Sequence, residues 1–166
     1  VLPFWYLCDV CKNKPIIVNE EEIQERLYYN NVQINGKWQQ YPVMELRQYS
    51  KLMHSKKPSM VSIDKAGFKW DHKTVTNEKE KAYCKAVFNY RIGKGFITSS
   101  DALWMACNIL KVHQEVARAL VARFPYIIVD EAQDNSELHF EFFKLLRRAE
   151  LQNLEFVGDI CQSIYG

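Results

Sequence analysis

Hydrophobic residues in the last third of the chain follow two different periods. Residues 126–129, YIIV, form a continuous apolar run with β-branched side chains, which is typical of a strand buried on both faces. Residues 137–149 place apolar side chains three or four positions apart, which predicts a helix with one apolar face. A second short apolar run begins at residue 154 and ends in Gly158-Asp159. Strand, helix and strand in this order predict a βαβ unit with two parallel strands.

The residues before this unit carry a helical pattern. Apolar positions recur along residues 97–124, behind the potential caps Ser99 and Ser100, and predict one or two long helices that end before Pro125. Another helix is expected from near Asn77 to Arg91, followed by Gly93 as a stop signal.

The pattern in the first seventy residues is weaker. Asn19 precedes three glutamates and predicts the start of a helix, because acids favour a helix N-terminus. Residues 34–38, INGKW, predict a hairpin turn, since Asn-Gly readily adopts positive φ. We expect a helix over residues 43–55 and extended or irregular chain over residues 60–70.

The amino-acid composition indicates that the chain can form a buried hydrophobic core. Its 166 residues are 48% hydrophobic and 13% aromatic, which suits one domain, or one domain and part of another. No apolar run approaches the ~20 residues of a membrane helix, and the first residues lack the features of a secretory signal. We therefore expect a soluble, cytoplasmic protein. The chain does not begin with Met, so its natural N-terminus can lie upstream.

Charge is spread unevenly along the chain. Residues 1–98 carry 16 Lys/Arg and 10 Asp/Glu, whereas residues 99–166 carry 6 and 10. Two lysine clusters, Lys51/Lys56/Lys57 and Lys65/Lys69/Lys73, stand in the basic part. This asymmetry is compatible with a polyanion-facing segment joined to an acidic one, although a solvated basic surface explains any single lysine.

The five cysteines are an odd number without the spacing of a disulfide framework, which fits a reducing compartment. Cys8 and Cys11 have zinc-ligand spacing, and His54, His72 or Cys84 could complete a site. Without a second cysteine pair, ordinary buried thiols are the favoured interpretation.

Both short apolar runs are followed by polar residues: DEAQD at residues 130–134 and GDICQ at residues 158–162. The carboxyl ends of parallel strands meet at one edge of a sheet, where ligands bind in open α/β folds. Adjacent side chains on extended backbone point in different directions, so Asp130 can hold Mg²⁺ while Glu131 faces a water molecule. That division of labour suits phosphoryl transfer, and a neutral amide such as Gln162 suits contact with a terminal phosphate. A single acid would be explained equally well as a solvent-exposed strand end, but the combination favours a nucleotide site.

The segments VDEAQD and VGDICQSIYG strongly resemble motifs II and III of the UvrD/Rep-type superfamily 1 DNA helicases, and residues 97–127 resemble the helical segment before motif II. The resemblance implies an α/β fold: a partial RecA-like parallel sheet of the P-loop NTPase type at residues 113–166. It further implies that residues 1–112 are a mostly helical inserted accessory subdomain that faces DNA.

The same resemblance implies roles for individual residues. Asp130 would hold Mg²⁺, Glu131 would activate the hydrolytic water, and Gln162 would contact the γ-phosphate of ATP. Gln133 and Asp134 would organise the nucleotide site where the two motifs meet.

Tyr165 would lie near single-stranded DNA, where an aromatic ring can stack on a base, although a tyrosine packed under a loop is an equal alternative. Asp159 would belong to the motif III turn. Ala132 stands where the family often has Phe, and Ile160-Cys161 stands where it often has acids.

The sequence lacks the phosphate-binding pattern G-x-x-x-x-G-K-[ST], and RIGKGF at residues 91–96 does not match it. We therefore expect a fragment of a larger helicase that uses ATP and Mg²⁺ and acts on DNA, single-stranded and at duplex junctions, together with the remaining helicase domains. The fragment alone is expected to be inactive. Two alternatives stay open: a non-catalytic nucleic-acid or protein binding module with a vestigial ATPase motif, and a metal-dependent nuclease.

Overall fold

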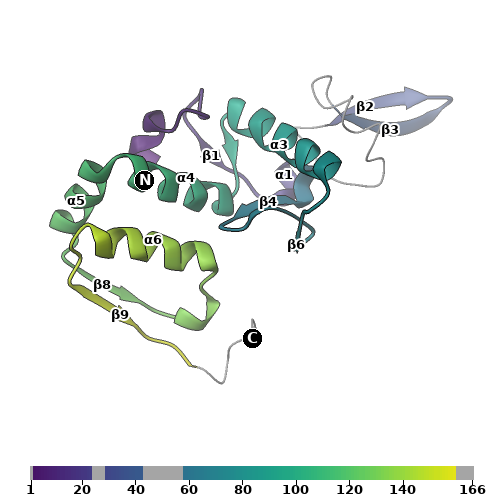
Figure 1. The fold of residues 1–166 in the computed structure, drawn as a ribbon. Coiled ribbons are helices and arrows are strands. Elements are labelled where there is room, and N and C mark those ends of the chain that lie inside the picture. The colour runs from purple at the N-terminus through teal and green to yellow at the C-terminus, as the bar shows by residue number, and fades with distance from the viewer. Residues whose placement is uncertain (1, 24–28, 43–57, 160–166) are drawn as a thin grey trace. The chain divides into compact units, whose positions relative to one another are not determined.

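The computed structural model describes residues 2–23, 29–42 and 58–159, which fall into two compact units, Val1–Ala102 and Leu103–Gly166 (Figure 1). The division lies inside helix α4 (Ser99–Val112), upstream of the boundary expected at residue 112. That functional boundary stays a prediction. The helix expected over residues 43–55 lies outside the described residues. No helix within the described ranges is both long enough and apolar enough to cross a membrane.

The N-terminal unit combines helices with short strands. In chain order its elements are η1 (Leu2–Leu7), β1 (Ile16–Ile17), α1 (Glu20–Glu22), β2 (Tyr29–Ile34), β3 (Lys37–Pro42), η4 (Pro58–Met60), β4 (Val61–Asp64), β5 (Gly67–Trp70), β6 (Lys73–Thr74), α3 (Glu78–Gly93), β7 (Phe96–Ile97) and the start of α4. The strands form a β2–β3 hairpin, an antiparallel β4–β5–β6 sheet and a parallel β1–β7 pair. The described part of the unit is therefore more mixed than the mostly helical subdomain that the sequence predicts.

Local signals in this unit are matched by the structure. Asn35 and Gly36 take φ values of 52° and 75° between β2 and β3, which confirms the predicted hairpin turn. Asn77 is the N-cap of α3, and its Oδ1 accepts hydrogen bonds from the backbone N–H groups of Lys79 and Glu80. The helix continues to Gly93, two residues beyond the predicted end at Arg91, and Lys94 is its C-cap.

The core of the N-terminal unit lies between α3 and the β4–β5–β6 sheet. Its fully or almost fully buried members are Ile23, Val61, Trp70, Val75, Tyr83, Cys84 and Val87. The rings of Trp70 and Tyr83 lie 5.1 Å apart between centroids. Apolar burial of this kind contributes about 25 cal/mol per Å² of surface removed from water.

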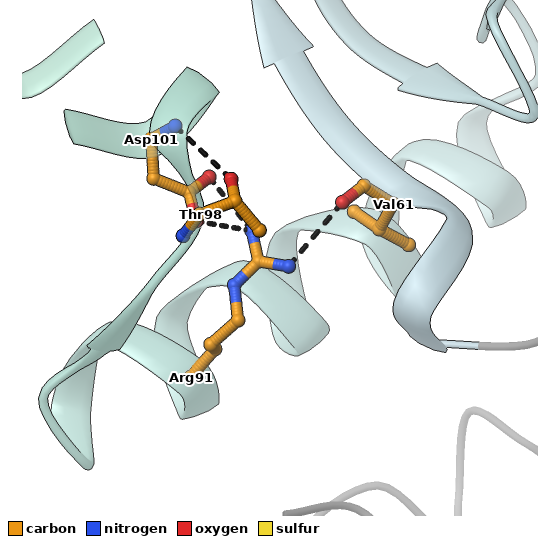
Figure 2. Close-up of polar contacts among 4 residues, drawn as sticks. All are labelled: Val61, Arg91, Thr98 and Asp101. Carbon is orange, nitrogen blue, oxygen red and sulfur yellow. Dashed lines mark hydrogen bonds and ion pairs between the residues drawn. The ribbon is translucent and has the colours of Figure 1, made fainter. Parts of the chain in front are cut away.

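A buried ion pair joins three elements of this unit (Figure 2). Arg91 and Asp101 are both 0% exposed, and Nη2 of Arg91 lies 2.7 and 2.6 Å from the two oxygens of Asp101. Arg91 Nη1 donates to the carbonyl of Val61 at 3.3 Å. The same Asp101 carboxylate accepts the N–H of Thr98, whose hydroxyl accepts the N–H of Asp101. Helix α3, strand β4 and the first turn of α4 are thereby tied to one charge pair.

The C-terminal unit contains the predicted βαβ arrangement. After the rest of α4 come α5 (Gln114–Arg123), β8 (Tyr126–Val129), η5 (Ala132–Asp134), α6 (Glu137–Arg148) and β9 (Asn153–Phe156). Strands β8 and β9 pair in parallel, and α6 connects them (Figure 1). The helical region expected over residues 97–124 consists of two helices that meet at His113.

The expectation that residues 126–129 are buried on both faces is wrong. Tyr126 and Ile128 are 51% and 58% exposed. Helix α6 lies on the opposite face, where the ring of Phe156 in β9 lies 5.8 and 5.5 Å from those of Phe140 and Phe143. The strand is thus shielded on one face, and the apolar residues of the other face meet solvent.

The buried ion pair predicts a large effect of removing its positive partner. We expect Arg91→Met to lower the free energy of unfolding by about 3–5 kcal/mol, because Asp101 would stay buried without its counter-charge. Lys81→Met is the matched control in α3, since it removes an exposed ion pair with Glu78 and is expected to cost below about 1 kcal/mol. Urea denaturation of both variants measures the difference, and equal costs would contradict a special role for Arg91.

Candidate active site

The carboxyl ends of β8 and β9 lie at one edge of their sheet. The parallel register pairs Val129 with Phe156, and the N–H of Val157 continues the ladder to the carbonyl of Val129 at 2.8 Å. The N–H of Ala132 then returns to the carbonyl of Val157 at 2.9 Å. The prediction that the two polar segments meet at one edge is therefore confirmed for residues 130–134 and 158–159.

Asp130 and Glu131 leave β8 through an unusual backbone conformation. Glu131 takes a left-handed conformation with φ 48° and ψ 46°, which costs a non-glycine residue about 1–3 kcal/mol. Asp130 Oδ1 accepts the N–H of Glu131 at 2.9 Å. Both side chains are exposed. The turn thus presents two neighbouring carboxylates to solvent at the strand end.

Gln133 connects the two segments through its side-chain amide. Its Nε2 donates to Oε2 of Glu131 at 2.6 Å, and its Oε1 accepts the backbone N–H of Asp159 at 3.1 Å. A single amide therefore holds one carboxylate after β8 and the backbone after β9.

Gly158 makes this bridge sterically possible. A Cβ atom built at Gly158 would lie 2.3 Å from Oε1 of Gln133 and 2.9 Å from the backbone nitrogen of Ala132. Real Cβ atoms do not approach so closely, so any larger residue would displace Gln133. The glycine before Asp159 is needed for this close approach of two loops.

The chain then turns into α6 through a short capped segment. The N–H of Asp134 donates to the carbonyl of Glu131 at 2.9 Å, and Asp134 itself is exposed. Ser136 is the N-cap of α6, and Nδ1 of His139 accepts the N–H of Ser136 at 3.1 Å. Burial lowers the pKa of His139 and so favours its neutral ring, in which Nδ1 can accept this bond when the proton is on Nε2. Helix α6 thereby fixes where the acidic turn ends.

The structure brings Asp130, Glu131, Gln133 and Asp159 together, with Asp134 at the end of the same turn. Gln162 and Tyr165 lie outside the described residues, and so do Ile160 and Cys161. The sequence pattern did not indicate the contact between Gln133 and Glu131. The signal that could have suggested it is the glycine at position 158, since a glycine after a strand often marks a close backbone approach.

The acidic turn fits a magnesium ion better than a metal held mainly by protein ligands. Mg²⁺ usually takes one or two carboxylates and completes its octahedron with waters and phosphate oxygens. Asp130 is exposed and engages one of its oxygens with the N–H of Glu131, which leaves room for that arrangement. Within the described ranges no group of three or more His, Cys, Asp or Glu side chains could hold a metal. Neither His72 nor Cys84 therefore completes a zinc site with Cys8 and Cys11, and His54 lies outside the described residues.

Comparison with models of protein families shows to which family the chain belongs. The model of the UvrD/REP helicase N-terminal domain matches residues 9–166, which is almost the whole chain. The protein belongs to this family. The resemblance of its two strand-end segments to motifs II and III is therefore part of a likeness that extends through the N-terminal unit as well.

Curated relatives carry helicase names. A probable DNA helicase of Mycoplasma pneumoniae is 34% identical over 103 residues, which is 60% of this chain and 19% of that protein. A probable DNA helicase II homolog of the same organism is 36% identical over 69 residues, 42% of this chain and 10% of that protein. The ATP-dependent DNA helicase Rep of Buchnera aphidicola is 29% identical over 89 residues, 53% of this chain and 13% of that protein. The chain thus spans less than a fifth of the length of these relatives. No solved structure matches it.

The Gln133 bridge predicts a specific effect of filling the space at Gly158. We expect Gly158→Ala to displace the Gln133 amide and to shift the NMR resonances of that amide and of the Asp159 backbone N–H. The stability cost is expected to be about 1–3 kcal/mol, the usual range of overpacking, because the Gln133 side chain can move aside but the backbone nitrogen of Ala132, 2.9 Å from the added Cβ, must shift as well. Gly93→Ala is the control, since nothing lies within 4 Å of the Cβ that it adds. Unchanged Gln133 resonances in Gly158→Ala would show that the bridge does not exist in solution.

Proposed function

We propose that this chain is part of an ATP-dependent DNA helicase or translocase. In the intact protein, hydrolysis of Mg-ATP would drive movement along single-stranded DNA and unwinding of the duplex, in the cytoplasm. The observation that carries the proposal is the Gln133 bridge, because it joins the carboxylate after β8 to the backbone after β9. Membership of the helicase family and the names of the relatives support the same activity.

The proposed chemistry divides between the two acids. Asp130 holds Mg²⁺, which supplies positive charge to the phosphate oxygens when it is bound. Glu131 accepts a proton from the attacking water, as a general base within hydrogen-bonding reach of it. Gln133 donates to Oε2 of Glu131, so it fixes the carboxylate while Oε1 faces the water. The left-handed backbone at Glu131 contributes to the same placement.

Three further residues complete the proposed site. Gln162 contacts the γ-phosphate, where a neutral amide detects the phosphate without adding negative charge. Asp134, together with Gln133, organises the nucleotide site between the two segments. Tyr165 stacks on a base of single-stranded DNA irrespective of sequence.

The N-terminal unit is proposed to face DNA. Lys69 and Lys73 lie on the small β4–β5–β6 sheet, and Lys65 lies in the turn between β4 and β5. Lys65 and Lys73 are exposed. Lys69 forms an ion pair with Asp64 at 2.6 Å, so part of its charge is neutralised. Contacts of exposed lysines with phosphates release counterions and give an affinity that falls with salt and ignores sequence. The other partners are the remaining helicase domains of the parent protein.

The isolated 166-residue chain is expected to hydrolyse no ATP, with or without DNA. Its sequence contains no phosphate-binding G-x-x-x-x-G-K-[ST] loop, so the opposite wall of the nucleotide site is missing. A phosphate-release assay with Mg-ATP and single-stranded DNA measures this. DNA-stimulated hydrolysis by the pure chain would contradict the proposal that it is a fragment.

In the intact parent protein, Glu131→Gln is expected to lower kcat for ATP hydrolysis by about 10²–10⁴, the usual contribution of a general base. Nucleotide binding should persist, because Asp130 and the amide contacts remain. Glu137→Gln is the matched control, since Glu137 is an exposed acid in the first turn of α6. Equal ATPase rates in the two variants would remove Glu131 from the mechanism. No ATP hydrolysis by the unmodified parent would instead favour a non-catalytic binding module.

A further inference from the structure

The segment Cys8–Cys11 is not used by the proposed function. Cys8 follows η1, with its N–H bonded to the carbonyl of Trp5 at 3.0 Å. The N–H of Cys11 donates to the carbonyl of Cys8 at 2.9 Å, so the two cysteines are the first and last residues of a hydrogen-bonded turn. In such a turn the terminal Cα atoms lie within about 7 Å. A disulfide needs a Cα separation of about 4.4–6.8 Å. The Cα separation that the turn allows therefore overlaps the range of disulfide-bonded cysteines.

The two thiols lie just beneath an exposed surface. Cys8 and Cys11 are 8% and 9% exposed, whereas Asp9 between them and Lys12 after them are exposed. Burial raises the pKa of Cys8. The pKa of Cys11 is also raised, by burial first and by the charge of Cys8 second.

The chain directly after the turn is firmly attached to the rest of the N-terminal unit. Asn13 Nδ2 donates to the carbonyl of Gly93 at 2.8 Å. The N–H of Ile16 donates to the carbonyl of Gly95 at 2.7 Å, where β1 begins its pairing with β7. Gly95 has φ +82°, and a Cβ there would lie 3.0 Å from the carbonyl oxygen of Lys14. These contacts hold the C-terminal side of the turn in place.

We propose that Cys8 and Cys11 form a reversible intramolecular disulfide by exchange with a low-molecular-weight disulfide such as oxidised glutathione. The thiolate of one cysteine attacks a sulfur of glutathione disulfide, forms a mixed disulfide and releases one glutathione thiolate. The second cysteine attacks the protein sulfur of the mixed disulfide and releases the other. The protein loses two electrons and two protons, and one glutathione disulfide becomes two glutathione molecules.

A disulfide fits this turn better than a metal ion. A structural zinc site takes four ligands, mostly Cys and His. Within the described ranges no third Cys, His, Asp or Glu joins Cys8 and Cys11 to form a metal-binding group. Two adjacent thiols suffice for a disulfide. The sulfur of Cys11 donates to the carbonyl of Asn13 at 3.3 Å, so the structure represents the reduced form.

Two deeply buried cysteines serve as internal controls. Cys84 is 0% exposed in the core of the N-terminal unit, and Cys107 is 2% exposed in the C-terminal unit. Burial raises the pKa of Cys107 to about 11, and it also raises the pKa values of Cys8 and Cys11. The comparison therefore depends on the lower exposure of Cys84 and Cys107 and on the hydrogen-bonded turn that Cys8 and Cys11 share. Cys84 and Cys107 are both expected to stay thiols under conditions that oxidise the Cys8–Cys11 turn.

The test uses the 166-residue chain in glutathione buffers of increasing oxidised fraction. Exchange is stopped with acid, the chain is unfolded in denaturant so that buried thiols are also accessible, remaining thiols are alkylated with iodoacetamide, and the protein is cut with trypsin. The peptide of residues 1–12 contains Cys8 and Cys11 and no other cysteine, while peptides 82–85 and 95–111 contain Cys84 and Cys107. In oxidising buffer we expect peptide 1–12 to carry no alkyl group and to have the mass of the peptide minus two hydrogens. After treatment with dithiothreitol, both cysteines should be alkylated again. Peptides 82–85 and 95–111 should remain alkylated throughout.

Variants distinguish closure of the pair from oxidation of one thiol. In Cys8→Ser, Cys11 is expected to stop at the mixed disulfide with glutathione, whereas Cys84→Ser should leave closure of the pair unchanged. If Cys8→Ser does not fold, the peptide map of the unmodified chain still decides. The proposal is overturned if peptide 1–12 stays fully alkylated in oxidising buffer, or if the unmodified chain stops at a mixed disulfide. Zinc retained at one equivalent per chain and lost in Cys8→Ser would equally overturn it, in favour of a metal site.

Discussion

The N-terminal unit depends on one buried charge pair, Arg91 with Asp101. Removing two charges from water is costly, and the cost is offset only where geometry is good and the remaining hydrogen-bonding groups are satisfied. Asp101 meets this condition by also accepting the N–H of Thr98, and Arg91 by also donating to the carbonyl of Val61. Within the described residues Nε of Arg91 has no partner, so the pair is satisfied incompletely. The start of α4 and the packing of α3 on β4 therefore cannot change independently.

A second coupling, weaker but closer to the proposed chemistry, operates in the C-terminal unit. The parallel pairing of β8 and β9 brings two loops together, and Gln133 spans the gap only because Gly158 has no side chain. The loop after β8 and the loop after β9 are therefore held together by the Gln133 side chain. A change in the backbone after β9 can reach Glu131 through the single side-chain amide of Gln133, which connects the segment after β8 with the segment after β9.

Much of the C-terminal unit could be predicted from the sequence because its signals are local. The helical spacing of apolar residues along residues 137–149 predicts a helix, which the structure shows as α6. The apolar runs at residues 126–129 and 154–157 predict two strands, and β8 and β9 are found there. The exposure of Tyr126 and Ile128 could not be predicted. An apolar sequence shows that both faces of a strand can be buried, but it does not show whether another element packs on each face. The sequence did not predict that β4, β5 and β6 form a sheet, because each strand is short and their pairing depends on the turns between them. One of these turns leads into β5 at Gly67, which has φ +115°. The Arg91–Asp101 pair and the Gln133 bridge were missed because no window of sequence shows which polar groups meet in space.

The left-handed backbone at Glu131 lowers the stability of the fold at a residue that the proposed activity requires. A residue in the left-handed region costs free energy that glycine would not, and asparagine or aspartate would cost less than glutamate. Glycine at this position would relax the turn and delete the carboxylate at the same time. Sequences selected only for robustness would therefore drift away from glutamate here, whereas selection for turnover would keep it. Under the proposed mechanism, position 131 exchanges stability for activity, and a substitution that stabilises the fold there is expected to lower that activity.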